Sequence, residues 1–155
     1  MNPYAPPEAT LHDQPAKPGS AFKAIALGLA VDIGGSLIGT VLLALVYGAA
    51  LGAAGVKGEE IAATMQASAP DSWFFSLGML VGLGFSVLGG YVCARIARRS
   101  ELKLGAILAA LSAISGLAIA GDDQQLGTLL SLTLLGIGAV LAGARLGLAK
   151  NRTGR

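Results

Sequence analysis

The amino-acid sequence predicts an all-α integral membrane protein, a four-helix bundle with both termini in the cytoplasm. Three observations lead to this fold class. Hydrophobic residues make up 54% of the 155 residues and charged residues only 13%, whereas soluble domains average about 25% charged residues. Apolar stretches long enough to cross a bilayer occur four times between residues 23 and 149, the predicted transmembrane domain. If the four stretches cross the membrane in turn, nearly all lysines and arginines lie on the same side of it.

Residues 1–22 are predicted to form a disordered cytoplasmic tail. Five of the six prolines lie here, and proline fixes φ and removes a backbone donor, so the tail is expected to be extended. It lacks the basic start, apolar stretch and cleavage site of a signal peptide, so we expect the mature chain to keep it. The opening residues 2–7 (NPYAPP) resemble the start of many small uncharacterised bacterial membrane proteins.

The first span is predicted over residues 24–51, an apolar stretch interrupted by one charge, Asp32. At 1.5 Å per residue it would extend for about 42 Å, longer than a hydrocarbon core of about 30 Å. The helix must therefore tilt, bend or protrude, and the pair Gly34 and Gly35 is a plausible place to bend. In the connection that follows, residues 59–66 are expected to form a short helix on the membrane surface.

The second span, residues 73–94, indicates the direction of the chain. It begins with the aromatic residues Trp73, Phe74 and Phe75 and leads into a basic cluster. Aromatic residues favour the membrane interface and basic residues the cytoplasmic side, so this helix is predicted to run from outside to inside. Its end, residues 89–97 (GGYVCARIA), resembles a pattern in small four-span bacterial inner-membrane proteins of unknown function. The resemblance implies a four-span architecture and does not imply any catalysed reaction.

The third and fourth spans are predicted over residues 104–120 and 126–149, joined by a tight turn and followed by a basic cytoplasmic tail, residues 150–155. Of the 11 lysines and arginines, only Lys57 then lies on the outer side. This asymmetry predicts cytoplasmic termini and a location in the inner membrane. The basic residues that set the topology are Arg95, Arg98, Arg99, Lys103, Arg145, Lys150 and Arg152.

Small residues are expected to guide helix packing, because helices in lipid gain little from hydrophobicity against one another. The chain has 23 glycines, and several are spaced four apart within predicted spans. The predicted packing residues are Gly35, Gly39, Gly78, Gly82, Gly143 and Gly147. Residues 27–39 and 77–89 also share a pattern at an offset of fifty, which fits either an inverted repeat or two helices with similar packing needs.

Asp32 is the one acidic residue well inside a predicted span, and ionisable residues in a membrane are functional candidates by default. It shares a helix face with Gly28 and Gly35, so it is expected to point into the bundle. An aspartate at mid-membrane costs about 2.5–3.5 kcal/mol on insertion scales. Two arrangements would relieve this: a neutral carboxyl that donates a hydrogen bond to a backbone or hydroxyl group, or a contact with Arg95 or Arg145 at the inner interface.

No complete catalytic, metal or nucleotide motif accompanies Asp32. The only histidine, His12, lies in the tail, so no serine or cysteine in a span has a histidine base, and one histidine with one cysteine, Cys93, cannot build a structural zinc site. We therefore expect no enzyme, no cofactor and no nucleic-acid partner; the partners are the bilayer and either another copy or another membrane protein. The predicted function is a structural or partner-binding membrane component. The alternative is a small oligomeric ion- or proton-coupled transporter that uses Asp32.

Overall fold

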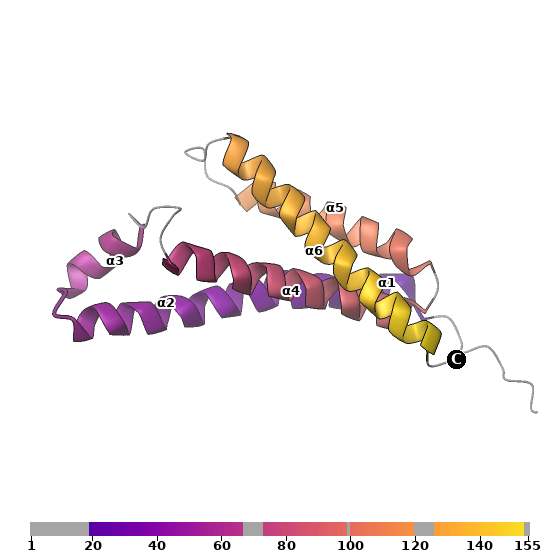
Figure 1. Cartoon of the computed structure of the whole chain (residues 1–155), viewed down its shortest axis with the longest axis horizontal. Helices are drawn as coiled ribbons and strands as arrows, with labels where there is room; N and C mark the ends of the chain where they lie inside the picture. The colour runs from indigo at the N-terminus through magenta and orange to yellow at the C-terminus, as the bar shows by residue number, and fades with distance from the viewer. Residues whose placement is uncertain (1–18, 67–72, 99, 120–125, 154–155) are drawn as a thin grey trace, which may run out of the picture.

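The computed structural model describes residues 19–66, 73–98, 100–119 and 126–153. Most of the predicted N-terminal tail, the tight turn after the third span, Arg99 and the last two residues lie outside the described residues. The described segments are helices joined by short links, without a strand among them. Figure 1 shows their order along the chain.

Four helices are long and apolar enough to cross a membrane: Ala21–Ala53, Trp73–Ala97, Glu101–Ile119 and Leu126–Thr153. Each coincides with a predicted span and extends beyond it at one end or both. For the described part of the chain, the prediction of an all-α fold with four helices long and apolar enough to cross a membrane is therefore confirmed. The last helix, α6 (Leu126–Thr153), continues four residues beyond the predicted span, so residues 150–153 are helical and not part of a separate tail.

The first long helix contains an irregular turn at Asp32. It consists of α1 (Ala21–Leu29), the π-helical turn η1 (Ala30–Gly34) and α2 (Gly35–Ala53). Ser20 begins it, because its side chain accepts a hydrogen bond from the Lys23 backbone N–H at 3.5 Å. A π turn inserts one residue into the helical ladder, and such turns are frequent at functional sites. The π turn ends at Gly34, the first residue of the glycine pair at which the sequence predicted a bend.

The helix α4 (Trp73–Ala97) is the central element, packed against α1, η1, α2, α5 (Glu101–Ile119) and α6. Its most extensive contact is with α6, where glycine lets the two backbones touch. A Cβ atom on Gly90 would overlap the Val140 carbonyl, and one on Gly143 would overlap the Val87 carbonyl. The buried core is accordingly made of small side chains with few large ones, and its largest fully buried side chains are Leu108, Val140 and Cys93.

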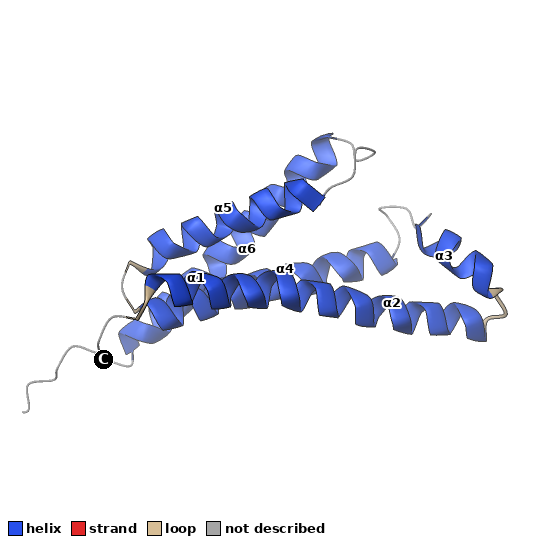
Figure 2. Cartoon of the chain, turned by 180° about the vertical axis from the view of Figure 1, so that it is seen from behind, coloured by secondary structure: helices blue, strands red, loops and turns tan. Residues whose placement is uncertain are grey.

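The helices form two pairs that diverge from a common end. Figures 1 and 2 show α4 beside α2 and α5 beside α6, with the two pairs close together near α1 and apart at the other end. Consistent with this, α5 packs on α1, α4 and α6, whereas α2 packs on α4, η1 and the short helix α3 (Gly58–Gln66). No residue of α2 is buried.

The common end brings together three segments that are distant in sequence. The Gly19 backbone N–H donates to the Ala97 carbonyl at 3.2 Å. Asn151 donates to the Ala94 carbonyl at 3.0 Å and accepts a hydrogen bond from Arg95 at 3.0 Å. The start of the first helix, the α4–α5 link and the end of α6 therefore lie at the same end of the bundle.

The opposite end of the α2–α4 pair carries aromatic side chains. Tyr47 stacks on Phe74 with ring centroids 4.4 Å apart and meets Trp73 edge-on at 5.3 Å. The helix α3 lies beside α2, where Ile61 approaches Gly48. Aromatic residues at one end and basic residues at the other are the arrangement expected of a membrane helix pair.

Candidate functional site

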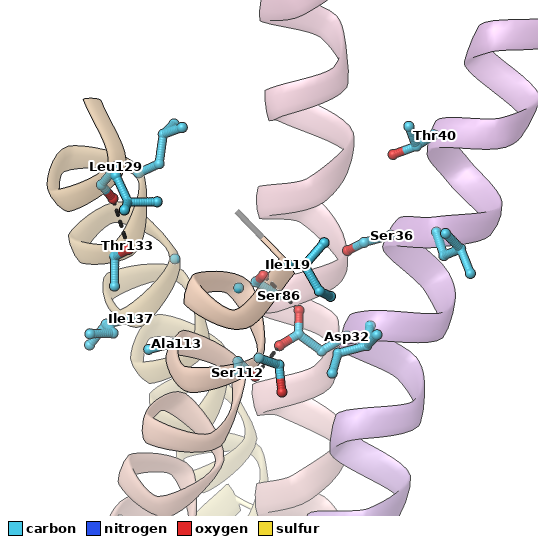
Figure 3. Close-up of a pocket in the computed structure, with 16 residues that line it drawn as sticks. Asp32, Ser36, Thr40, Ser86, Ser112, Ala113, Ile119, Leu129, Thr133 and Ile137 are labelled. Atoms are coloured by element: carbon cyan, nitrogen blue, oxygen red, sulfur yellow. Dashed lines mark hydrogen bonds between the residues drawn. The ribbon is translucent and has the colours of Figure 1, made fainter. Parts of the chain in front are cut away.

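Asp32 is buried at the centre of the π turn, with 4% of its surface exposed. Both oxygens of its carboxyl group accept hydrogen bonds from serines on other helices. The Ser86 hydroxyl on α4 donates to Oδ1 at 2.7 Å, and the Ser112 hydroxyl on α5 donates to Oδ2 at 2.5 Å. One carboxyl group thus joins three of the four long helices (Figure 3).

Glycines allow the helices to come this close to Asp32. A Cβ atom on Gly89 would lie 2.8 Å from the Cβ of Asp32 and 2.7 Å from the Gly28 carbonyl oxygen. A Cβ atom on Gly28 would lie 2.9 Å from the Cβ of Cys93. All three distances are shorter than a real Cβ atom allows, so the backbone of α4 can approach the first helix here only because side chains are absent. Ser86 lies one turn before Gly89 on the same face of α4, so the close approach at Gly89 places the Ser86 hydroxyl beside the Asp32 carboxyl group.

Ser112 reaches Asp32 because it lies on the inner face of α5. Glu101, Gly105 and Leu108 are buried, and Ser112 continues their spacing of four, three and four residues. The Gly105 position faces Ala144 of α6, where an added Cβ would lie 2.7 Å from the alanine methyl. The contact between α5 and α6 therefore sets the position of the second serine.

The sequence left two arrangements open for Asp32, a hydrogen bond with a backbone or hydroxyl group and a contact with an arginine. In the structure, hydroxyl groups contact the carboxyl group. Here the hydroxyls donate and the carboxyl group accepts, whereas the sequence argument had a neutral carboxyl donate. Asp32 contacts neither Arg95 nor Arg145: the Arg95 guanidinium donates to Asn151, and Arg145 is exposed on α6.

A cavity of about 530 Å³ lies beside Asp32, between α2 and the α5–α6 pair. We call it the Asp32 cavity. Its polar lining, shown in part in Figure 3, is Asp32, Ser36, Thr40, Ser86, Ser112, Ser115 and Thr133. The remainder is apolar, and two of these residues, Leu37 and Ile119, are 65% and 78% exposed. The cavity is therefore open to its surroundings between the two helix pairs.

Sequence reasoning did not assemble this polar lining. Of the residues that line the cavity, the sequence predicted a functional role for Asp32 alone. A usable signal was present, because Asp32, Ser36 and Thr40 recur every four residues along one face of an otherwise apolar helix.

The predicted packing glycines differ in their surroundings. Gly35 and Gly39 face the Phe85 ring of α4, and Gly143 and Gly147 of α6 face the backbone of α4. On α4 itself, the predicted pair lies in a looser environment: a Cβ on Gly78 would be 3.8 Å from Leu43, an ordinary contact, and nothing lies within 4 Å of one on Gly82. The close approach on α4 occurs at Gly89 and Gly90 instead, because α1 and α6 cross α4 there.

The predicted topology residues that the structure describes are exposed. They are Arg95, Arg98, Lys103, Arg145, Lys150 and Arg152. They lie in or beside the α4–α5 link and toward the end of α6, which meet at the common end of the bundle. Lys57 follows α2 at the opposite end. Beside them, Glu101 is buried and accepts a hydrogen bond from Asn151 at 3.4 Å.

Metal ligation is not indicated in this part of the chain. Within residues 19–66, 73–98, 100–119 and 126–153, no group of three or more His, Cys, Asp or Glu side chains is placed to hold a metal ion. Cys93 is fully buried in the small-residue core.

Comparison with family models, with curated proteins and with solved structures gives no match for this chain.

Proposed function

We propose that the chain is a multi-pass protein of the inner membrane, with both termini in the cytoplasm, and that it acts as a non-enzymatic binding component. In this proposal the long helices are a scaffold, and a partner molecule occupies the Asp32 cavity within the bilayer. The observation that carries the proposal is the set of seven polar side chains that line an open cavity between apolar helices.

The hydrogen bonds of Asp32 support a scaffold role. They join the first long helix to α4 and α5, and interhelical hydrogen bonds stabilise helix association in membranes by roughly 0.6–1.7 kcal/mol each. The cavity supports a binding role. Polar groups without partners are unfavourable in hydrocarbon, so hydroxyls such as those of Ser36 and Thr40 favour an occupant with polar atoms over lipid chains.

Photo-cross-linking from two leucines of α2 tests the binding role. Leu37 lines the cavity and Leu45 does not, yet their side chains are almost equally exposed, at 65% and 64%. With benzoylphenylalanine at Leu37, we expect discrete adducts in native membranes, detected by gel shift and intact-mass spectrometry. At Leu45 we expect lipid adducts only. The same lipid adducts at both positions would contradict a binding role for the cavity.

Thiol labelling tests the topology. In a Cys93→Ser background, a single cysteine at Lys57 is expected to react with a membrane-impermeant thiol reagent in intact cells, because it lies at the end of the bundle that the basic residues avoid. Cysteines at Ser100 and Thr153 are expected to react only after the membrane is opened. Labelling of Ser100 in intact cells would reverse the proposed orientation.

A second candidate function is a small oligomeric ion- or proton-coupled transporter. The observation in its favour is that Asp32 lies within a helix long and apolar enough to cross a membrane and lines the open cavity. Against it, the described residues that line the cavity include no second acidic or histidine side chain to form a relay. Asp32→Asn separates the two candidates, because asparagine keeps the size and hydrogen bonding of aspartate but does not titrate.

A further inference from the structure

We propose that the Asp32 cavity binds an amphipathic organic cation, a small apolar molecule that carries one protonated amine. The proposal rests on the proposed function, because it requires the cavity to be a binding site, and it adds the chemical class of the ligand.

The first argument is charge. Among the described residues of the lining, Asp32 is the one acidic group, and no Lys, Arg or His occurs there. Its two hydrogen-bond partners are neutral hydroxyls. A carboxylate in a low-dielectric environment favours a cation strongly, and the described residues of this chain supply none in the cavity.

The second argument is the supply of hydrogen-bond acceptors. A hydroxyl group has one proton to donate and two lone pairs that accept. Ser86 and Ser112 donate their protons to Asp32, and Thr133 donates its proton to the Leu129 carbonyl at 2.8 Å. These groups therefore present lone pairs to the cavity. An ammonium group, with three donors and no acceptor, is complementary to such a site.

The third argument is size and shape. A volume of about 530 Å³ lies within the range of roughly 300–1,000 Å³ that is common for small-molecule sites. A divalent metal ion is the less suitable occupant, because Asp32 is the one carboxyl group among the described residues of the lining and no group of three or more His, Cys, Asp or Glu side chains in the described part of the chain could hold a metal ion. The apolar part of the cavity lining consists mostly of leucine and isoleucine side chains, and the exposed Leu37 and Ile119 lie where the cavity opens. An alkyl body would pack there, while the amine reaches Asp32.

A pair of photoactivatable probes tests the proposal on the full-length protein in nanodiscs of phosphatidylcholine and phosphatidylglycerol. One is a ten-carbon alkylamine with a diazirine, and the other is the alcohol of the same length. We expect saturable labelling of cavity residues by the amine, and at least about tenfold weaker labelling by the alcohol, because a hydrogen bond to a charged group is stronger than one to a neutral group.

Two amide variants separate the cavity from other acidic groups. Asp32→Asn is expected to raise the half-saturating amine concentration at least about tenfold. Glu101→Gln is the matched control, because Glu101 is the other buried carboxyl group among the described residues, 9% exposed, and does not line the cavity. It is expected to leave labelling unchanged. If Asp32→Asn does not fold, the amine and alcohol probes on the unaltered protein still decide the outcome.

Equal labelling by amine and alcohol, or unchanged labelling of a folded Asp32→Asn variant, would overturn the proposal. Loss of amine labelling on adding phosphatidylethanolamine would also overturn it, because the occupant would then be a lipid head group. A protein adduct at Leu37 that the alkylamine does not displace would overturn the ligand class and leave the binding role standing. Identical lipid adducts at Leu37 and Leu45 would remove both.

Discussion

Gly90→Leu is expected to prevent stable folding of the bundle. The first carbon of the new side chain would overlap the Val140 carbonyl and lie 3.1 Å from the Ala144 backbone nitrogen. Backbone atoms of a helix cannot move aside as a flexible side chain can, so α4 and α6 must separate along their most extensive contact. Overpacking in a core typically costs about 1–3 kcal/mol, and we expect a loss at or above the upper value. Thermal unfolding in mild detergent, followed by circular dichroism, measures it.

Gly82→Leu is the matched control on the same helix. Nothing lies within 4 Å of a Cβ at Gly82, and leucine has the higher helix propensity, so the change is expected to lie within about 0.5 kcal/mol of the unaltered protein or to stabilise it. Equal unfolding temperatures for Gly90→Leu and Gly82→Leu would contradict the packing described for α4. A loss confined to Gly82→Leu would instead indicate a contact with another copy or another protein at that face.

Asp32→Leu is expected to destabilise the bundle by about 1–3 kcal/mol, because it removes the acceptor of both interhelical hydrogen bonds. The Ser86 and Ser112 hydroxyls can then bond only within their own helices. Asp32→Asn is expected to unfold at nearly the same temperature as the unaltered protein. Its amide oxygen accepts from one serine, and its NH₂ group donates to the other, since a hydroxyl can take either role.

The same two variants decide between the candidate functions. On the binding-component proposal, Asp32→Asn inserts and folds like the unaltered protein, whereas Asp32→Leu is impaired in both respects. If Asp32→Asn folds normally but abolishes pH-dependent transport in reconstituted vesicles, the transporter replaces the binding component. Equal stability for Asp32→Asn and Asp32→Leu would contradict the structural role of the two hydrogen bonds.

The long helices could be predicted from the sequence because each is a nearly uncharged apolar stretch of sufficient length. Their ends were less predictable. The last helix continues through Asn151, whose side chain donates hydrogen bonds to the Ala94 carbonyl of α4 and to Glu101 of α5. Such contacts between distant segments cannot be predicted from a local sequence pattern. The basic residues correctly predicted which segments lie together at one end of the bundle, since Arg95 and Arg152 are both found there. Which side of the membrane that end faces stays a prediction.

The candidate site was predictable in one residue and not in its surroundings. Asp32 stood out because a charge in an apolar stretch is rare. Its partners did not, because Ser112 is 80 residues away in sequence and serine is unremarkable in a membrane helix. The packing face of α4 was ambiguous for a related reason: Gly78, Gly82, Gly89 and Gly90 all allow close approach, and only the crossing points of the neighbouring helices select among them.

The divergence of the two helix pairs makes the described part of the molecule wedge-shaped. Its cross-section is small at the end where α1, α4 and α6 meet and large at the end that carries α3 (Figures 1 and 2). In the membrane orientation proposed above, such a shape takes up more area in one leaflet than in the other. We expect lateral pressure in the wider leaflet to bring the pairs together and stretching of the membrane to spread them. The width of the space beside Asp32 is therefore expected to depend on membrane tension and curvature.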